Sequence, residues 1–303
     1  MRGLQTFRIA TEDRIGDAAK PWGTGLRALV DELVTRWELD LGDPAETGGV
    51  AYAVPATRSG DRSVVLKLAY PDAWFFEEIA ALSQWDGNGA VTLLDHDPRG
   101  AQLLAGVEPG TPLAALEDED EALERAAAVA ERLWIPDPGG IATVTSEAQE
   151  WGRTMLGRHH LAGRPFEREL VHEAAGAIRD LIATAPRGVL LHGDLTLANV
   201  LDGGEHGDVA TNPRPLVGEP EFDAAALLRS SPDVLAADPE HARDRVQHRF
   251  DLVRERLGLE GSRLKSWALA VSVDEAIWDF EQGAISAGRR QTDIARFVRD
   301  LLV

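Results

Sequence analysis

The sequence contains no cysteine, which excludes disulfides, thiolate metal sites and a thiol nucleophile. It also lacks any run of about 18 apolar residues, the length that a membrane-spanning helix needs. Residues 1–25 have no apolar core of the kind found in signal peptides, so we predict a cytoplasmic protein with no membrane partner. The motif G-x-x-x-x-G-K-[ST] does not occur, and this absence excludes the P-loop class of nucleotide-binding proteins.

Basic residues are scarce, because 31 Lys and Arg stand against 51 Asp and Glu and give a formal net charge of −20 at pH 7. The phosphates of a nucleic acid would be repelled by this charge, so we predict no nucleic-acid partner. The same excess favours a monomer and a cationic or polar small-molecule substrate. Solubility alone is the other interpretation of the acidity.

The first part of the chain reads mostly as strands, and 303 residues are enough for two lobes. β-rich runs at 49–57 and 63–69 flank "RSGDR", a hairpin signal, and a helical stretch at 73–85 precedes β-rich runs at 91–96 and 101–107. The segment "GVEPGTP" is rich in glycine and proline, as is typical of a hinge. We therefore predict a β-rich lobe at 1–105 and a hinge at 106–112.

The remainder of the chain, residues 113–303, shows helical periodicity and is predicted to form a helical lobe. Short apolar runs at 188–191 and 208–210 interrupt it. The predicted fold class is α+β, with a small β-rich lobe and a larger helical lobe. The helical patterns cover 113–134, 145–160, 166–184, 221–230, 239–257, 261–285 and 289–302.

The segment "LHGDLTLANV" follows an apolar run and places Asn199 five residues after Asp194. Phosphoryl transfer needs a carboxylate that receives the proton of the substrate hydroxyl and an amide oxygen that holds a metal. Asp194 and Asn199 have the spacing of this pair in the kinase catalytic loop. His192 could instead act as a general base in a hydrolase, but neither G-x-S-x-G nor H-E-x-x-H occurs in the chain.

A nucleotide kinase also needs a lysine that neutralises phosphates, usually on a strand and paired with a carboxylate on a helix. Lys67 in "VVLKLA" stands within an apolar strand, where the structural alternative is a lysine at the edge of a sheet. Glu77 and Glu78 lie in the next helical stretch, about ten residues on. We favour Glu78 as the partner because of its position.

Together with these residues, longer segments resemble the aminoglycoside phosphotransferases, and within them the streptomycin and hydroxyurea resistance kinases. The resemblance runs from about residue 28 to residue 290. The motif HGDxxxxN followed by G-[DE]-P-x-x-D is the combination that makes this resemblance specific. The similar segments are "LKLAYP", "AALSQWDGNGAVTLLDHDPRGAQLL", "HGDLTLANVL", "NPRPLVGEPEFDAAALL" and "AIWDFEQGA".

The resemblance implies a protein-kinase-like bilobal fold that binds ATP and Mg2+ in a cleft and phosphorylates a hydroxyl of a small natural product or aminoglycoside-like antibiotic. It implies that the lobe at 1–105 binds the nucleotide, that Lys67 contacts the phosphates and that Glu78 holds Lys67. It assigns catalysis and substrate binding to the helical lobe at 113–303. In the helical lobe it implies that Asp194 is the catalytic base and that Asn199 is a magnesium ligand.

The resemblance assigns further residues to supporting roles. Asp223, in "GEPEFD", would brace the catalytic loop, and His192 is assigned to the same structural support. The backbone from Leu104 to Val107 would meet the adenine.

Several positions depart from the family pattern around the nucleotide site. Asn212 stands where the family has its second magnesium aspartate, and Ala105 and Gly106 replace an acidic–basic pair before the hinge. An amide carries no charge, so a cation that bridges phosphates loses its strongest protein ligand and the metal site is predicted to be impaired. Thr196 stands where the family often has histidine, and Trp134 where a Leu-His pair usually ends a helix.

These departures leave two alternatives open. One is a kinase-fold protein in natural-product biosynthesis that uses Asp194 for chemistry other than phosphoryl transfer. The other is a non-catalytic pseudokinase that binds a metabolite or a partner protein. Both alternatives place the predicted binding of ATP and Mg2+ in question.

The segment "SVDEAIWDFEQGA" supplies a candidate substrate surface. Asp274, Trp278 and Glu281 follow one another at spacings of four and three residues, so they share one face of a helix. An acidic and aromatic face suits a cationic ligand through charge and cation–π contact. The alternative is an ordinary helix in which Trp278 belongs to the core and the carboxylates are solvated.

Overall fold

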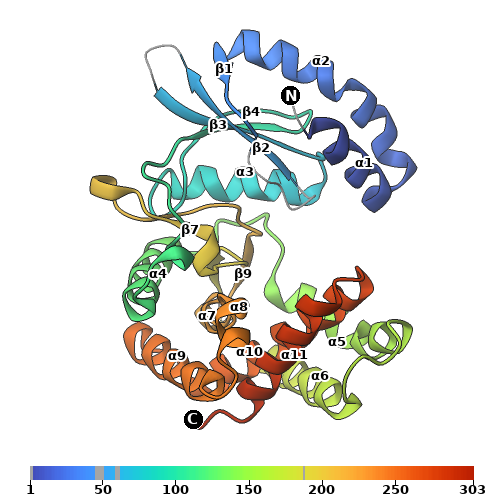
Figure 1. Ribbon diagram of the computed structural model, residues 1–303, viewed down its shortest axis with the longest axis vertical. Helices are drawn as coiled ribbons and strands as arrows, with labels where there is room; N and C mark the ends of the chain where they lie inside the picture. Colours follow the sequence, from blue (N-terminus) through green and yellow to red (C-terminus); the bar gives the residue numbers. More distant parts are fainter. Residues whose placement is uncertain (1–2, 45–50, 59–61, 187) are drawn as a thin grey trace. The chain divides into compact units, whose positions relative to one another are not determined.

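The computed structural model describes residues 3–44, 51–58, 62–186 and 188–303 (Figure 1). The start of the predicted strand at 49–57 and the centre of the hairpin signal "RSGDR" lie outside these residues. The chain forms two compact units, which are described separately below. The first comprises Met1–Gly110 with Asp202–Val209, and the second comprises Thr111–Leu201 with Ala210–Val303.

The first unit contains an antiparallel five-stranded sheet in the order β1-β2-β3-β5-β4. Between residues 51 and 105 the order strand, strand, helix, strand, strand is as predicted from the sequence. The strands are β1 (Leu39–Leu41), β2 (Ala51–Arg58), β3 (Arg62–Ala69), β4 (Leu93–Asp97) and β5 (Ala101–Ala105), and the helix between β3 and β4 is α3 (Ala73–Trp85).

Two helices at the start of the chain correct the expectation that this region is mostly strands. They are α1 (Leu4–Ile15) and α2 (Lys20–Arg36), separated by the 3-10 turn η1 (Asp17–Ala19). Leu26, Val30 and Leu33 on α2 are buried at helical spacing, and they belong to the same core cluster as residues of β2, β3 and β5. The prediction is wrong here because it followed the β-rich runs further along and missed this period.

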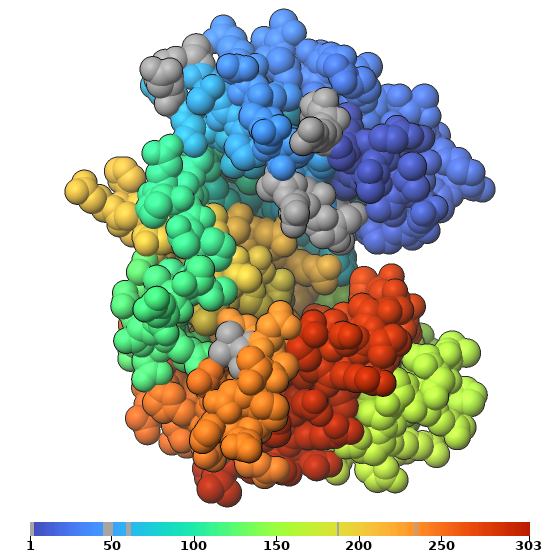
Figure 2. Space-filling view, viewed as in Figure 1, coloured from blue at the N-terminus to red at the C-terminus, as the bar shows by residue number. Residues whose placement is uncertain are grey.

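The second unit is helical, and α10 runs through its centre, packed against α5, α6, α7 and α11. Its helices are η2 (Leu113–Ala115), α4 (Glu119–Leu133), α5 (Val144–Leu161), α6 (Arg168–Ala183), η3 (Leu197–Asn199), α7 (Pro220–Leu228), α8 (Pro232–Ala237), α9 (Ala242–Leu257), α10 (Gly261–Glu281) and α11 (Ile285–Arg299). The predicted α+β class, with a small sheet and a larger helical part, is confirmed. α8 was not predicted from the sequence. It is in contact with α11, and Figure 2 shows the orange atoms of this part of the chain beside the red atoms of α11.

Short strands frame the segment that carries the HGD motif. β6 (Val189–Leu191) pairs with β9 (Leu216–Gly218), and β7 (Val200–Leu201) pairs with β8 (Val209–Ala210). The turn η4 (Gly204–His206) lies between β7 and β8. None of the helices in the described ranges has the length and apolarity needed to span a bilayer. The predicted lobe and hinge boundaries stay predictions, and the compact units divide after Gly110.

Candidate active site

The HGD motif leaves the buried strand β6 through a turn that only glycine fits. Gly193 has φ +81°, and a Cβ at this position would collide with the carbonyl oxygen of Arg214. The backbone N–H of Arg214 donates to the carbonyl oxygen of His192 at 2.8 Å. The loop is therefore held close to the segment that follows β8.

Asp223 anchors the start of this loop. Its carboxylate accepts hydrogen bonds from the backbone N–H groups of His192 (2.8 Å) and Gly193 (2.7 Å) and from the indole N–H of Trp134 (3.1 Å). The side chain is fully buried, and burial raises the pKa of Asp223, against the effects of His192 and of the three hydrogen bonds. The indole of Trp134 thus helps to satisfy this buried carboxylate.

His192 bridges two segments of backbone. Its Nε2 lies 3.0 Å from the carbonyl oxygen of Thr211, and its Nδ1 accepts from the N–H of Asp194 at 3.3 Å. The N–H of Asp194 needs an acceptor at Nδ1 and the carbonyl oxygen of Thr211 needs a donor at Nε2, so these two contacts match a ring that donates from Nε2. The ring is fully buried, and this arrangement argues against the hydrolase interpretation of His192.

Asp194 and Asn199 lie together, as their spacing predicts for a catalytic loop. The Nδ2 group of Asn199 donates to the backbone oxygen of Asp194 (2.8 Å) and to its Oδ2 (2.9 Å). These two bonds fix the amide so that Oδ1 of Asn199 points away from Asp194. The side chain of Asp194 is 28% exposed, so the carboxylate remains accessible to a substrate hydroxyl.

Asn212 is placed beside this pair through its neighbour Thr211. The N–H of Thr211 donates to the carbonyl oxygen of Asn199 at 2.8 Å. Asn212 itself has φ +59°, the left-handed conformation that asparagine and aspartate adopt more readily than most residues. The second unit thus brings Asp194, Asn199 and Asn212 into one region.

The residues of this region fit a hard cation by donor type, since Mg2+ prefers oxygen ligands. Asp194 offers a carboxylate, and Asn199 and Asn212 offer amide oxygens. Within the described ranges, no group of three or more His, Cys, Asp or Glu residues could hold a metal ion. A cation bound by these three residues would meet one carboxylate and two amide oxygens.

Arg229 is a residue of the site that the sequence did not reveal. Its Nη2 lies 3.0 Å from Oδ1 of Asp194 and 3.8 Å from Oε1 of Glu275 on α10. No local pattern marks an arginine that follows a helix as the partner of a residue 35 positions earlier. Only the folded chain shows that the carboxylate of Asp194 is held by both Arg229 and Asn199.

Lys67 and Glu78 form a buried ion pair in the first unit, with Nζ and Oε1 2.6 Å apart. β3, which carries Lys67, lies between β2 and β5, so the alternative of a lysine at a sheet edge is excluded. Glu78 on α3 is buried, whereas Glu77 is only partly buried. The geometry of the pair supports the choice of Glu78, and the contact of Lys67 with phosphates stays a prediction.

The segment predicted to meet adenine begins on β5 and continues into the following loop. The N–H groups of Ala105 and Gly106 donate to the carbonyl oxygens of Thr92 and Ser63, each at 2.9 Å. Leu104 is buried on β5 and Val107 lies in the loop after it. The N–H groups of Ala105 and Gly106 are therefore already bonded within the unit. The contacts of Leu104 and Val107 with adenine stay a prediction.

The predicted substrate face on α10 is partly neutralised. Arg158 on α5 contacts Asp274 (Nη1–Oδ1, 2.6 Å) and Glu281 (Nη2–Oε2, 2.8 Å), which confirms that both acids share one face. Trp278 is 39% exposed, so the alternative that places it in the core does not hold. No local pattern in the sequence marks Arg158, because its partners lie 116 and 123 positions away. The substrate role of the three residues stays a prediction.

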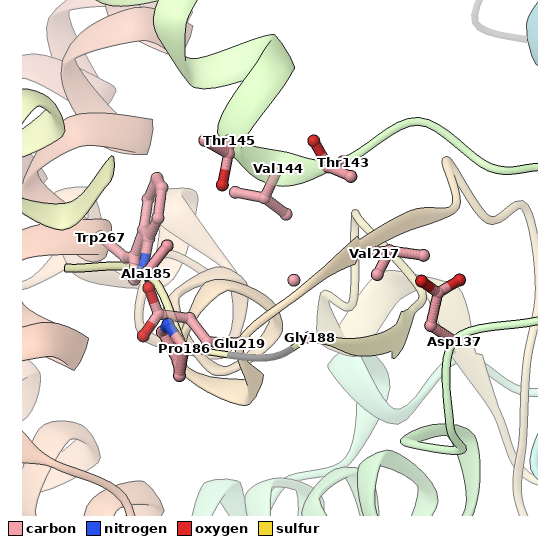
Figure 3. A pocket seen from close by; sticks show the side chains of 11 residues that line it. Asp137, Thr143, Val144, Thr145, Ala185, Pro186, Gly188, Val217, Glu219 and Trp267 are labelled. Atoms are coloured by element: carbon pink, nitrogen blue, oxygen red, sulfur yellow. Dashed lines mark hydrogen bonds between the residues drawn. The ribbon is translucent and has the colours of Figure 1, made fainter. Parts of the chain in front are cut away.

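A separate pocket of the second unit lies between the start of α5 and the region around β9 (Figure 3). Its volume of about 200 Å³ is below the roughly 300–1,000 Å³ typical of small-molecule sites. Its buried acid, Glu219, is paired with Arg263 and accepts from the indole N–H of Trp267 at 2.6 Å. Among its described lining residues there are none of the predicted site residues, so this pocket does not enlarge the site.

The chain matches the family model of aminoglycoside/hydroxyurea antibiotic resistance kinases over residues 37–283. It belongs to this family. The streptomycin 6-kinase of Streptomyces glaucescens is 32% identical over 286 residues, which cover 94% of this chain and 92% of that protein. The hydroxyurea phosphotransferase of Kitasatospora aureofaciens is 31% identical, over 92% of this chain and 81% of that protein.

The fold of these antibiotic resistance kinases is also found by structural comparison. An aminoglycoside phosphotransferase from Streptomyces rimosus, solved with ADP and streptomycin, superposes with a TM-score of 0.56 at 18% identity, over 82% of this chain and 98% of that one. The resemblance stated from the sequence, the protein-kinase-like fold and the prediction of a small-molecule kinase are confirmed.

We expect Asp223→Asn to destabilise the second unit. An amide nitrogen in place of one carboxylate oxygen would face an N–H donor of the loop or of Trp134 and leave it unsatisfied, which costs about 1–3 kcal/mol for a buried group. Urea unfolding followed by tryptophan fluorescence measures this loss. Asp180→Asn, which alters an exposed carboxylate on α6, is the matched control. An unchanged unfolding midpoint for Asp223→Asn would contradict the bracing role.

Asp274 is expected to make stability depend on pH. Burial raises its pKa to about 6 from an ordinary value of 3.8, against the opposing effect of Arg158. Between these values the folded chain holds a proton that the unfolded chain releases, so stability falls as the pH rises, by about 3 kcal/mol in total.

In Asp274→Asn this contribution is absent, so its unfolding free energy should fall less than that of the natural chain between about pH 4 and pH 7. Urea titrations across this range test the difference. Glu173→Gln, at an exposed acid on α6, serves as the control. Parallel pH profiles for the natural chain and Asp274→Asn would refute the assignment.

Proposed function

We propose that the chain is an ATP-dependent phosphotransferase that transfers the γ-phosphate of ATP to a hydroxyl of a small natural product or aminoglycoside-like antibiotic. The observation that carries the proposal is the fixed carboxylate of Asp194, bonded to Asn199 on a loop that Asp223 braces. The names of the relatives, a streptomycin 6-kinase and a hydroxyurea phosphotransferase, support this class of acceptor.

In this proposal Asp194 orients the acceptor hydroxyl and receives its proton as the hydroxyl oxygen attacks phosphorus. Lys67 neutralises the phosphates of ATP, and Glu78 keeps the ammonium in place through their 2.6 Å contact. Asn199 and Asn212 would hold Mg2+. When bound, the cation supplies charge that offsets the negative charge of the phosphates.

The proposed nucleotide site is weaker than the family pattern implies. Asn212 provides a neutral oxygen where an aspartate would provide a charged one, so we propose weak magnesium-dependent binding of ATP and slow turnover. The same observation favours a second candidate function, a pseudokinase that binds a metabolite without turnover. Among the residues that the structure describes, we find no feature that favours the alternative of non-phosphoryl chemistry in biosynthesis.

The acceptor is proposed to be a cationic or polar small molecule. The formal net charge of −20 attracts cations, and Glu275 is 39% exposed near Arg229 and Asp194. The structure of the Streptomyces rimosus relative contains streptomycin, which supports an acceptor of the aminoglycoside class. We also propose that the chain is a monomer, that it works in the cytoplasm and that it has no nucleic-acid partner.

Asp194→Asn tests the catalytic assignment. The side chain keeps its shape but no longer accepts a proton, so turnover should fall by roughly 100-fold or more, the scale of general-base removal. Release of ADP in the presence of streptomycin and related acceptors measures this turnover. Asp180→Asn on α6 should leave it unchanged. Near-normal turnover in Asp194→Asn would show that another group receives the proton.

Asn212→Asp tests the metal site and separates the two candidate functions. The added charge should strengthen binding of Mg·ATP by roughly tenfold, equivalent to about 1.4 kcal/mol, and leave binding without magnesium no tighter. Calorimetric titration with and without magnesium measures both quantities, with Asn88→Asp, at an exposed residue of the first unit, as the charge control. If Asn212→Asp binds no ATP, the kinase proposal fails. Tight binding and rapid turnover in the natural chain would refute the impaired metal site.

A further inference from the structure

Arg229 is held in place by the turn that ends α7. The hydroxyl of the next residue, Ser230, accepts from the backbone N–H of Leu197 at 3.1 Å and donates to the carbonyl oxygen of Ala226 at 3.2 Å. Leu197 belongs to the catalytic loop, between Asp194 and Asn199. The end of α7 is therefore joined directly to the loop that carries the catalytic carboxylate.

A buried arginine of α9 locks the same turn from the other side. Nη1 of Arg249 donates to the carbonyl oxygens of Leu228 (3.1 Å) and Ser230 (2.7 Å), and Nη2 pairs with Glu119 of α4. Its side chain is fully buried, and burial lowers the pKa of Arg249. A buried cation is costly unless it is paired and hydrogen-bonded, and a cation at the C-terminus of a helix complements the helix dipole. The residues on both sides of Arg229 are thus fixed.

The guanidinium of Arg229 is directed at carboxylates. The side chain is only 10% exposed and lies between Asp194 (3.0 Å) and Glu275 (3.8 Å). Its Nε is buried and has no hydrogen-bond partner within the residues that the structure describes. Leaving a buried N–H unsatisfied costs about 1–3 kcal/mol of folding free energy. The guanidinium of Arg229 is thus placed for its contacts with the carboxylates and leaves its own Nε–H unbonded.

We propose that Arg229 is a positioning residue for phosphoryl transfer, which fixes the carboxylate of Asp194 toward the acceptor hydroxyl. This inference rests on the proposed function. Arg229 bonds Oδ1 and Asn199 bonds Oδ2, so the plane of the carboxylate is set from both sides. Each oxygen retains a further lone pair, which accepts from the hydroxyl. A base held in its reactive orientation avoids the entropic cost of being ordered during the reaction.

The test compares Arg229→Gln, Arg229→Lys and Arg229→Ala with the natural chain. Arg153→Gln, which removes a 70% exposed arginine of α5, is the matched control for lost charge. Turnover and the KM for ATP are measured separately, each variant is checked by urea unfolding, and Arg229→Ala is also assayed with added methylguanidinium. A crystal structure of Arg229→Gln reports the rotamers of Asp194.

Turnover in Arg229→Gln should fall by roughly tenfold or more, a part of what loss of a general base costs, with the KM for ATP and the unfolding midpoint nearly unchanged. Arg229→Lys should restore part of the turnover, and methylguanidinium should restore part of it in Arg229→Ala. Turnover in Arg229→Gln within about twofold of the natural chain overturns the proposal. So does a loss that neither lysine nor methylguanidinium reverses, since a purely structural role predicts that result.

Failure of the proposed function gives a different result. A natural chain that transfers no phosphate to any acceptor refutes the kinase proposal, whatever Arg229 does. The crystal structure of Arg229→Gln then decides the positioning role by itself. Asp194 in more than one rotamer supports that role, and Asp194 in a single unchanged rotamer overturns it.

Discussion

The carboxylate of Asp223 is the contact on which the rest of the candidate site depends. It is buried in the first turn of α7 and receives the two backbone N–H groups of His192 and Gly193. These bonds set the direction in which the chain leaves β6, and Asp194 is the next residue. The burial of a carboxylate is unfavourable unless its oxygens are satisfied, so this contact is formed correctly only when loop, helix and Trp134 are all in place.

One short helix therefore holds the loop that carries Asp194 at two points. α7 has nine residues, and Asp223 near its start and Arg229 just beyond its end both reach the loop. At 1.5 Å per residue the two are separated by about 9 Å along the helix. A shift of α7 would move Asp223 and Arg229 together. The position of Asp194 is therefore coupled to the packing of α7 against α10.

The predictable parts of the structure are those that leave a local pattern in the sequence. Alternating and helical apolar periods identified β2, β3, α3 and most helices of the second unit, and fixed spacing identified Asp194 with Asn199. The contacts of Arg229 and Arg158 left no such pattern, because their partners lie far away in the sequence. The acidity of α10 was visible from the sequence, whereas its partial neutralisation depends on how α5 packs.

The close approach of β3 to the end of β5 limits how this chain can change. A Cβ at Gly106 would lie 2.7 Å from the backbone carbonyl carbon of Ser63 and closer still to its side chain. A side chain could therefore not be introduced at position 106 by a single substitution without moving the backbone of β3. A substitution at Gly106 would need coordinated changes in two strands, whereas the left-handed backbone of Asn212 accepts aspartate without such changes, so the two positions differ sharply in which side chains they can take.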